Sequence, residues 1–228
     1  MKPATPFVVP SSEAAAIAEQ DRLRTLVRPS GQPPSPLRLI AGLDVAYAVD
    51  ESRAAGAVTV LDAESLDVVE TATALRPVDF PYRPGLLAFR EIPALLDALS
   101  KLTITTPDVL VCDGYGLAHP RRFGLACHLG VLLDVPTFAV AKTAFVGTFT
   151  EPGAKRGEQT DLVDGGEVIG RVLRTRDGVK PVFVSVGHRL DLDAVTDLAL
   201  RLTASGYRQP ETTRQADQAC RRALAAGA

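Results

Sequence analysis

The feature that most constrains the fold is a change of hydrophobic period after a Pro-, Ser- and Gly-rich segment at residues 28–36. Before this segment, the apolar residues of 12–27 recur at a spacing typical of a helix. After it, apolar residues form short β-prone runs at 37–48, 57–61 and 68–75, which turn residues separate. Such runs predict three consecutive antiparallel strands. The body of the chain should therefore contain a sheet, and an all-helical fold is excluded.

The rest of the chain alternates helical and strand patterns. The predicted elements are a helix at 85–102, a strand at 108–113, a helix at 120–133, strands at 137–145, 167–174 and 181–186, and helices at 191–205 and 209–226. Pro93 should kink or restart the first helix, because proline cannot donate a backbone hydrogen bond. The order predicts a single α/β domain over residues 1–228, a mixed sheet flanked by helices, in which 28–36 is a linker.

Composition narrows the class of protein. The 228 residues are 46% hydrophobic and 23% charged, which is ordinary for a globular protein and excludes wholesale disorder. The longest uncharged stretch, residues 123–133, is too short to cross a bilayer, and no secretory signal precedes the body. We therefore expect a cytoplasmic protein with no membrane partner. The scattered Cys112, Cys127 and Cys220 predict reduced, buried thiols.

Three carboxylates occupy positions that a fold would not favour. Asp44 lies inside the first strand, and Asp113 ends an apolar strand. Glu91 lies beside the apolar stripe of a predicted helix, with Leu87 and Leu95 four residues away on either side. Taken singly, Asp113 could begin a turn and Glu91 could face water. Asp44 is harder to explain, because aspartate within a strand is disfavoured and its burial is costly.

Together these carboxylates predict a metal site. If strand ends bring Asp44 and Asp113 together, their like charges repel, and a hard divalent cation with oxygen ligands relieves the repulsion. Mg²⁺ binds through one or two carboxylates plus a substrate phosphate, which points to displacement at phosphorus. The chain lacks zinc-ligand spacing, a Walker phosphate loop and a GxSxG serine-hydrolase motif.

Several ordered motifs carry a family resemblance. They are GLDVAY around Asp44, FPYRPGLLAFRE at 80–91, DGYGLAHPRR at 113–122, VAK at 140–142 and VSVGHRL at 184–190. In this order they resemble the endonuclease V family, from about Gln20 to the C-terminal helix. The chain departs from the family pattern at Phe138, Ala139 and Thr143, around the VAK motif.

The resemblance implies a ribonuclease H-like fold and a metal-dependent endonuclease that acts on deoxyinosine in DNA or inosine in RNA. It implies cleavage of the second phosphodiester bond on the 3′ side of the deaminated base. By the same resemblance, Asp44 and Asp113 would bind Mg²⁺ or Mn²⁺, with Glu91 as a third acidic member. Lys142 and His188 match further residues of the family pattern.

Physical roles can be given to these two matched residues. Lys142 would offer a point charge to the scissile phosphate or the attacking water. His188 would orient water or protonate a leaving oxygen. The alternatives are a solvated lysine at a strand end and a structural histidine.

The segment Pro81-Tyr82-Arg83-Pro84 matches the wedge of the family. Two prolines stiffen a loop that presents an aromatic ring, which could enter a duplex and hold a nucleotide out of the helix. The alternative is a surface turn with a packed tyrosine.

An extruded hypoxanthine needs a closely fitting pocket. Gly114 and Gly116 would permit backbone approach, and Leu87 would form an apolar wall. Hypoxanthine lacks the exocyclic amines of adenine and guanine, so a tight pocket could exclude both. His119 and Arg121 fit phosphate contacts or loop positioning.

The expected partner is DNA that contains deoxyinosine, bound by a monomer, with inosine RNA as the alternative substrate. A non-catalytic binder of inosine-containing nucleic acid and a small-molecule phosphohydrolase are weaker alternatives. The net charge of −2 disfavours a broad basic footprint. Basic residues nevertheless gather in or beside the motifs: Arg83, Arg90, Arg121, Arg122, Lys142 and Arg189. Because the overall charge is slightly negative, we predict weak non-specific binding to nucleic acid.

Overall fold

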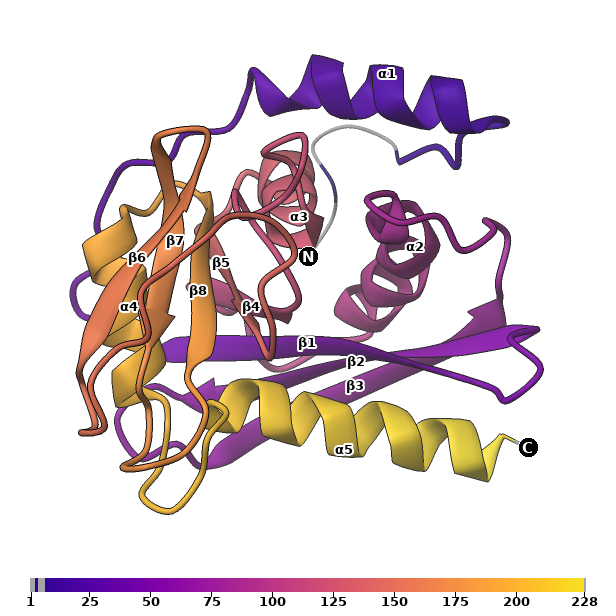
Figure 1. The fold of residues 1–228 in the computed structure, drawn as a ribbon. Coiled ribbons are helices and arrows are strands. Elements are labelled where there is room, and N and C mark those ends of the chain that lie inside the picture. The colour runs from indigo at the N-terminus through magenta and orange to yellow at the C-terminus, as the bar shows by residue number, and fades with distance from the viewer. Residues whose placement is uncertain (1–2, 4–6, 228) are drawn as a thin grey trace.

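A single mixed sheet organises the computed structural model, which describes residue 3 and residues 7–227 (Figure 1). Within that range its order is β3-β2-β1-β4-β5-β8-β7-β6. The strands are β1 Leu39–Tyr47, β2 Arg53–Asp62, β3 Val68–Pro77, β4 Val109–Asp113, β5 Thr137–Ala141, β6 Gln159–Asp164, β7 Glu167–Leu173 and β8 Val182–His188. The helices are α1 Glu13–Arg24, α2 Leu87–Ser100, α3 Leu125–Leu133, α4 Leu192–Arg201 and α5 Glu211–Ala226.

The topology confirms the predicted strand pattern. The first three strands form an antiparallel meander. The strands β4 and β5 then join parallel to β1, and β8 returns antiparallel to β5. The sequence analysis missed β6, which pairs with β7 in a hairpin at the sheet edge. Only Leu162 of β6 is buried, so the strand lacks the apolar alternation by which strands are predicted.

Helices cover both faces of the sheet (Figure 1). On one face, α2 and α3 pack against alternate strand residues such as Ala41 and Leu110. On the other face, α4 packs against Ile40 and Val111, and α5 covers β1 and β2. This alternation follows from the two-residue period of a strand, and it assigns each strand residue to one helical layer.

One predicted helix start needs correction, and one of the two alternatives predicted for Pro93 is excluded. The helix predicted from residue 120 begins only at Leu125, because the backbone turns at 120–122, where Arg122 has a left-handed φ of 54°. The helix α2 continues through Pro93 without restarting. Interior proline costs about 3 kcal/mol, whereas the buried Ile92, Leu95 and Leu99 of the same helix each contribute about 1.5–3 kcal/mol. Packing of the apolar stripe therefore outweighs the lost backbone bond.

The predictions for the cysteines hold. Cys112, Cys127 and Cys220 are free thiols, and all three are buried. Within the described part of the chain, every helix is too short or too polar to cross a membrane.

Candidate active site

Asp44, Asp113 and Lys142 share one face of the sheet, where β4 and β5 end beside the interior of β1. The parallel register pairs Leu43 with Cys112, so the two aspartates follow at adjacent positions. Val140 pairs with Asp113 and places Lys142 two residues further along the same face. The Lys142 Nζ lies 3.1 Å from Asp113 Oδ2, and the lysine side chain is about half exposed.

The two aspartates repel each other. Burial, followed by the charge of Asp113, raises the pKa of Asp44 to about 7. The Val45 amide donates a hydrogen bond of 2.8 Å to Asp44 and opposes this rise in part. Burial lowers the pKa of Lys142, but the charge and hydrogen bond of Asp113, together with the charges of Asp44 and Asp217, outweigh this effect and raise the pKa overall. A positive charge therefore stays beside the carboxylates at neutral pH.

Glu91 reaches the same region from the other helical layer. It lies near the start of α2 and is only 9% exposed, so the interpretation of Glu91 as a water-facing residue is wrong. Burial, followed by the charges of Asp44 and Asp113, raises its pKa well above the usual value. These three predicted carboxylates thus form one electrostatic group.

The loop at 81–84 stands between β3 and α2. Tyr82 is 58% exposed, which is unusual for a large ring and agrees with a ring presented to a partner. Its neighbour Arg83 lies 3.4 Å from a carboxylate oxygen of Glu13 in α1.

A cavity of about 200 Å³ adjoins this loop and reaches Glu91 and Asp113. Its lining includes Gln20, Tyr82, Arg83, Pro84, Gly85, Leu87, Glu91, Asp113, Gly114, Tyr115, His119, Gly124 and Phe145. Two rings form one side, with the centroids of Tyr115 and Phe145 5.2 Å apart. The cavity therefore combines an aromatic wall, backbone surface and access to acidic side chains.

Comparison with known proteins decides the family. The family model described as Endonuclease V matches residues 21–218. The chain belongs to the endonuclease V family. Endonuclease V of Nocardia farcinica is 54% identical over 222 residues, which cover 97% of both chains. As a member of this family, the chain is an endonuclease that hydrolyses phosphodiester bonds.

Solved endonuclease V structures confirm the ribonuclease H-like fold. The enzyme from Streptomyces avermitilis is 52% identical, has a TM-score of 0.91, and the match covers 100% of this chain and 99% of that one. Endonuclease V of Ciona intestinalis is 28% identical with a TM-score of 0.84, and the match covers 94% of this chain and 98% of that one. That structure is a complex with a 24-mer DNA containing an inosine followed by a ribo-adenosine.

The donor set of this family member fits a hard cation that keeps part of its water shell. Among the described residues, no group of three or more His, Cys, Asp and Glu side chains is arranged as a ready-made metal cage. The adjacent Asp44 and Asp113 nonetheless supply the one or two carboxylates through which Mg²⁺ usually binds. The raised pKa of Asp44 shows that its ionised form is unfavourable without a nearby positive charge. A bound cation would supply that charge.

His188 does not join this group. It pairs with Thr137 at the start of β5, whereas Asp113 pairs with Val140 near its end, about 10 Å further along the strand. Its Nδ1 accepts a hydrogen bond of 3.2 Å from the Arg28 amide, and its Nε2 lies 3.4 Å from an Asp134 oxygen. The structure therefore corrects the catalytic interpretation of His188: this buried side chain holds the 28–36 segment to the body.

Of the two glycines predicted for the base pocket, only Gly114 lines the cavity. Gly114 lines the cavity with a φ of 132°, a conformation that side chains rarely adopt. Gly116 lies outside the lining. A Cβ there would come within 2.0 Å of the Val186 carbonyl, so this glycine is needed for close packing against β8.

His119 and Arg121 both position the loop that ends at Gly85. Both donate to the Gly85 carbonyl, from Nε2 at 3.0 Å and Nη2 at 2.6 Å. Burial, followed by the charge of Arg121, lowers the pKa of His119 to about 4, so its ring is neutral. His119 lines the cavity and Arg121 lies behind it.

Most of the basic residues near the motifs are engaged with protein groups. Arg90 pairs with Glu51, Arg122 with Asp164 and Glu167, and Arg189 with Asp134. Arg83 and Arg121 likewise contact protein groups.

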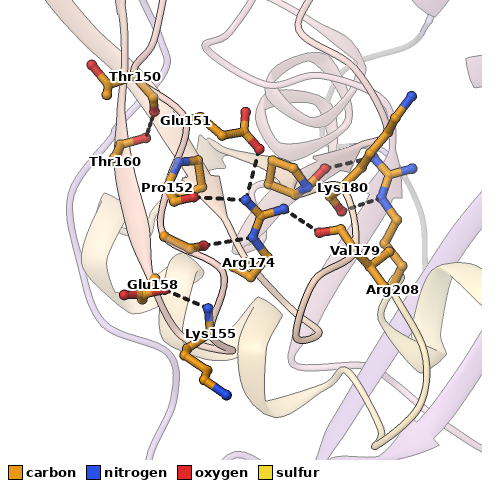
Figure 2. Close-up of polar contacts among 12 residues, drawn as sticks. Thr150, Glu151, Pro152, Lys155, Glu158, Thr160, Arg174, Val179, Lys180 and Arg208 are labelled. Carbon is orange, nitrogen blue, oxygen red and sulfur yellow. Dashed lines mark hydrogen bonds and ion pairs between the residues drawn. The ribbon is translucent and has the colours of Figure 1, made fainter.

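Arg208 holds the backbone at Lys142, and Arg174 holds a neighbouring loop. Arg208 donates to the carbonyls of Lys142 and Pro181, at 2.6 and 2.7 Å, and to that of Lys180 at 2.9 Å. Figure 2 shows Arg208 at the Lys180 carbonyl and the buried Arg174 among the carbonyls of a neighbouring loop. The chain around Lys142 is thus fixed although β5 has already ended.

Sequence analysis missed Asp217 of α5. Gly42 lets this helix approach β1 closely, because a Cβ at Gly42 would lie 1.9 Å from the Thr212 carbonyl. Asp217 then lies close enough for its charge to contribute to the raised pKa of Asp44. Its position three residues before the buried Cys220 is the same signal, a carboxylate beside an apolar stripe, that identified Glu91.

Proposed function

We propose that this chain recognises deoxyinosine in DNA and hydrolyses the second phosphodiester bond on its 3′ side, in the repair of deaminated adenine. The observation that carries the proposal is the cavity of about 200 Å³ that extends from the exposed Tyr82 to Asp113 and Glu91. Such a cavity suits a base turned out of a duplex with its backbone beside the carboxylates. The inosine-containing DNA bound by the Ciona relative supports the same substrate class.

The catalytic assignment follows from the electrostatics. Asp44 and Asp113 would hold Mg²⁺, or Mn²⁺ in its place, with Glu91 and Asp217 beside them. When bound, the cation supplies an activated water and charge stabilisation of the leaving oxygen. Lys142, held 3.1 Å from Asp113, supplies a fixed positive charge to the scissile phosphate.

The recognition assignment follows from the cavity walls. The ring of Tyr82 would fill the space that the extruded nucleotide leaves in the duplex. Leu87 and the aromatic pair Tyr115 and Phe145 would enclose the base, and the backbone at Gly114 would face its edge. A close fit would reject purines that carry an exocyclic amine.

An inosine-specific endoribonuclease is the alternative function. The ribo-adenosine after the inosine in the ligand of the Ciona relative favours it. We further propose that the chain acts as a monomer, from the family resemblance, and that it acts in the cytoplasm, from the sequence pattern.

The test is cleavage of three labelled oligonucleotides: deoxyinosine DNA, the same DNA with deoxyadenosine, and inosine RNA. The proposal expects Mg²⁺-dependent cleavage of the first at the second 3′ bond and no cleavage in EDTA. Asp44→Ala should abolish cleavage. Equal cleavage of the deoxyadenosine control would overturn base recognition, and undiminished cleavage in EDTA would overturn the metal assignment. Preferential cleavage of the RNA would favour the alternative.

A further inference from the structure

The amide of Gln20 links three parts of the recognition site to α1. Gln20 is 0% exposed, although it belongs to the N-terminal helix and lies just outside the residues matched by the family model. Its Nε2 donates to the carbonyls of Gly85, at 3.0 Å, and Phe123, at 3.3 Å. Its Oε1 accepts a hydrogen bond from Arg121 Nε at 2.5 Å. Both donor hydrogens and the acceptor are therefore engaged.

The two carbonyls belong to two segments, far apart in the sequence, that meet at the cavity. Gly85 follows the 81–84 loop directly, and its carbonyl also accepts hydrogen bonds from His119 and Arg121. Phe123 precedes Gly124, which also lines the cavity. One planar amide thus joins the segment that follows the 81–84 loop to the segment that enters α3.

This arrangement makes the distance between the two segments depend on Gln20. Without the Gln20 amide, the Gly85 carbonyl keeps His119 and Arg121, whereas the Phe123 carbonyl and Arg121 Nε lose this partner, so the Phe123 segment must shift to find another. This shift would change the width of the cavity. The carboxylates, which are fixed to strands and to α2, would stay in place.

We propose that Gln20 is a positioning residue that sets the width of the base pocket and thereby its selectivity for hypoxanthine over guanine. The inference rests on the proposed function, since it concerns the same pocket. Guanine differs from hypoxanthine by one exocyclic amine, so a small widening of the pocket is enough to admit it. Gln20 acts through the Gly85 and Phe123 carbonyls and needs no contact with the base.

The experiment measures kcat and KM on matched duplexes with deoxyinosine or deoxyguanosine at one position. The variants are Gln20→Leu, which removes all three hydrogen bonds, and Gln20→Glu, which keeps an acceptor for Arg121 but cannot donate to the carbonyls when ionised. For both, we expect the deoxyinosine-to-deoxyguanosine ratio of kcat/KM to fall roughly tenfold, the equivalent of one hydrogen bond. The loss for deoxyinosine should appear mainly in KM.

A control separates this role from simple docking of α1. Leu23 lies on the same helix, is buried against Phe123 and Cys127, and does not line the cavity. Leu23→Ala should lower the free energy of unfolding at least as much as Gln20→Leu, yet leave the selectivity ratio unchanged. The folded state of each variant is checked by thermal unfolding before the kinetics.

The possible outcomes distinguish failure of the Gln20 proposal from failure of the proposed function. An unchanged ratio in Gln20→Leu, or an equal fall in Leu23→Ala, would overturn the role of Gln20. A wild-type protein that does not prefer deoxyinosine would instead overturn the proposed function, so the two failures are distinguishable. Retained selectivity in Gln20→Glu together with a loss in Gln20→Leu would assign the effect to Arg121 and would also contradict bridging of the carbonyls.

Discussion

Replacing Asp44 by asparagine should stabilise the metal-free protein and abolish its catalytic activity. Burial and the charge of Asp113 raise the pKa of Asp44 from 3.8 to about 7. In the unfolded chain its pKa returns to the ordinary value. The native state therefore holds a proton that the unfolded state has lost between about pH 4 and pH 7, and stability falls as pH rises through this window.

The size of the effect follows from the same shift. A difference of about three pH units corresponds to about 4 kcal/mol, since each unit is worth 1.36 kcal/mol. This value is a ceiling, because water near the partly accessible site and rearrangement of its neighbours reduce it. We expect Asp44→Asn, which keeps the shape and removes the charge, to raise the free energy of unfolding by about 2 kcal/mol at pH 8. The gain should shrink toward pH 4.

The assay is urea unfolding in EDTA at pH 5 and pH 8, repeated with Mg²⁺. Asp44→Asn should be more stable than the wild type at pH 8 in EDTA, and the difference should be smaller at pH 5. Adding Mg²⁺ should stabilise the wild type more than the variant. An Asp44→Asn protein that is no more stable than the wild type at pH 8, or a gain independent of pH, would refute the electrostatic argument.

The remaining predictions concern separate parts of the site. Lys142→Met should lower kcat about 10²–10³-fold with little change in unfolding, because it removes one positioned charge; single-turnover kinetics measures this, and a near-normal rate would contradict it. Tyr82→Ala should weaken binding to deoxyinosine duplex by about 1–3 kcal/mol, as for loss of base stacking, and unchanged affinity by fluorescence anisotropy would count against the wedge. His188→Ala should cost about 1–3 kcal/mol of stability but leave kcat near the wild-type value, and a large loss of kcat at full folding would restore its catalytic role. Affinity for undamaged DNA should depend only shallowly on salt, and a steep dependence in a titration would reveal unrecognised phosphate contacts.

Much of the framework was predictable from the sequence alone. The change of period after residues 28–36 predicted the meander and the alternating elements, because side-chain spacing reflects local backbone geometry. Asp44 and Asp113 were identified as candidates because a carboxylate within an apolar strand needs a specific compensation. The ordered motifs were sufficient to predict the family.

Placement across the sheet required the tertiary structure. The VSVGHRL motif identified His188 but could not show at which end of β5 it lies, because strand direction and register are set by pairing with other segments. The burial of Glu91, the approach of Asp217 on α5 and the pairing of most nearby arginines depend on contacts between residues far apart in the sequence.

Gln20 shows most clearly the difference between what the sequence determines and what the tertiary structure decides. The sequence determined that a helix precedes the body and that Gln20 is three residues before the buried Leu23 on that helix. Only the packing of α1 decided that its amide meets the Gly85 and Phe123 carbonyls. Local periodicity fixes which face of a helix is buried, whereas the partners of that face are chosen by the assembled fold.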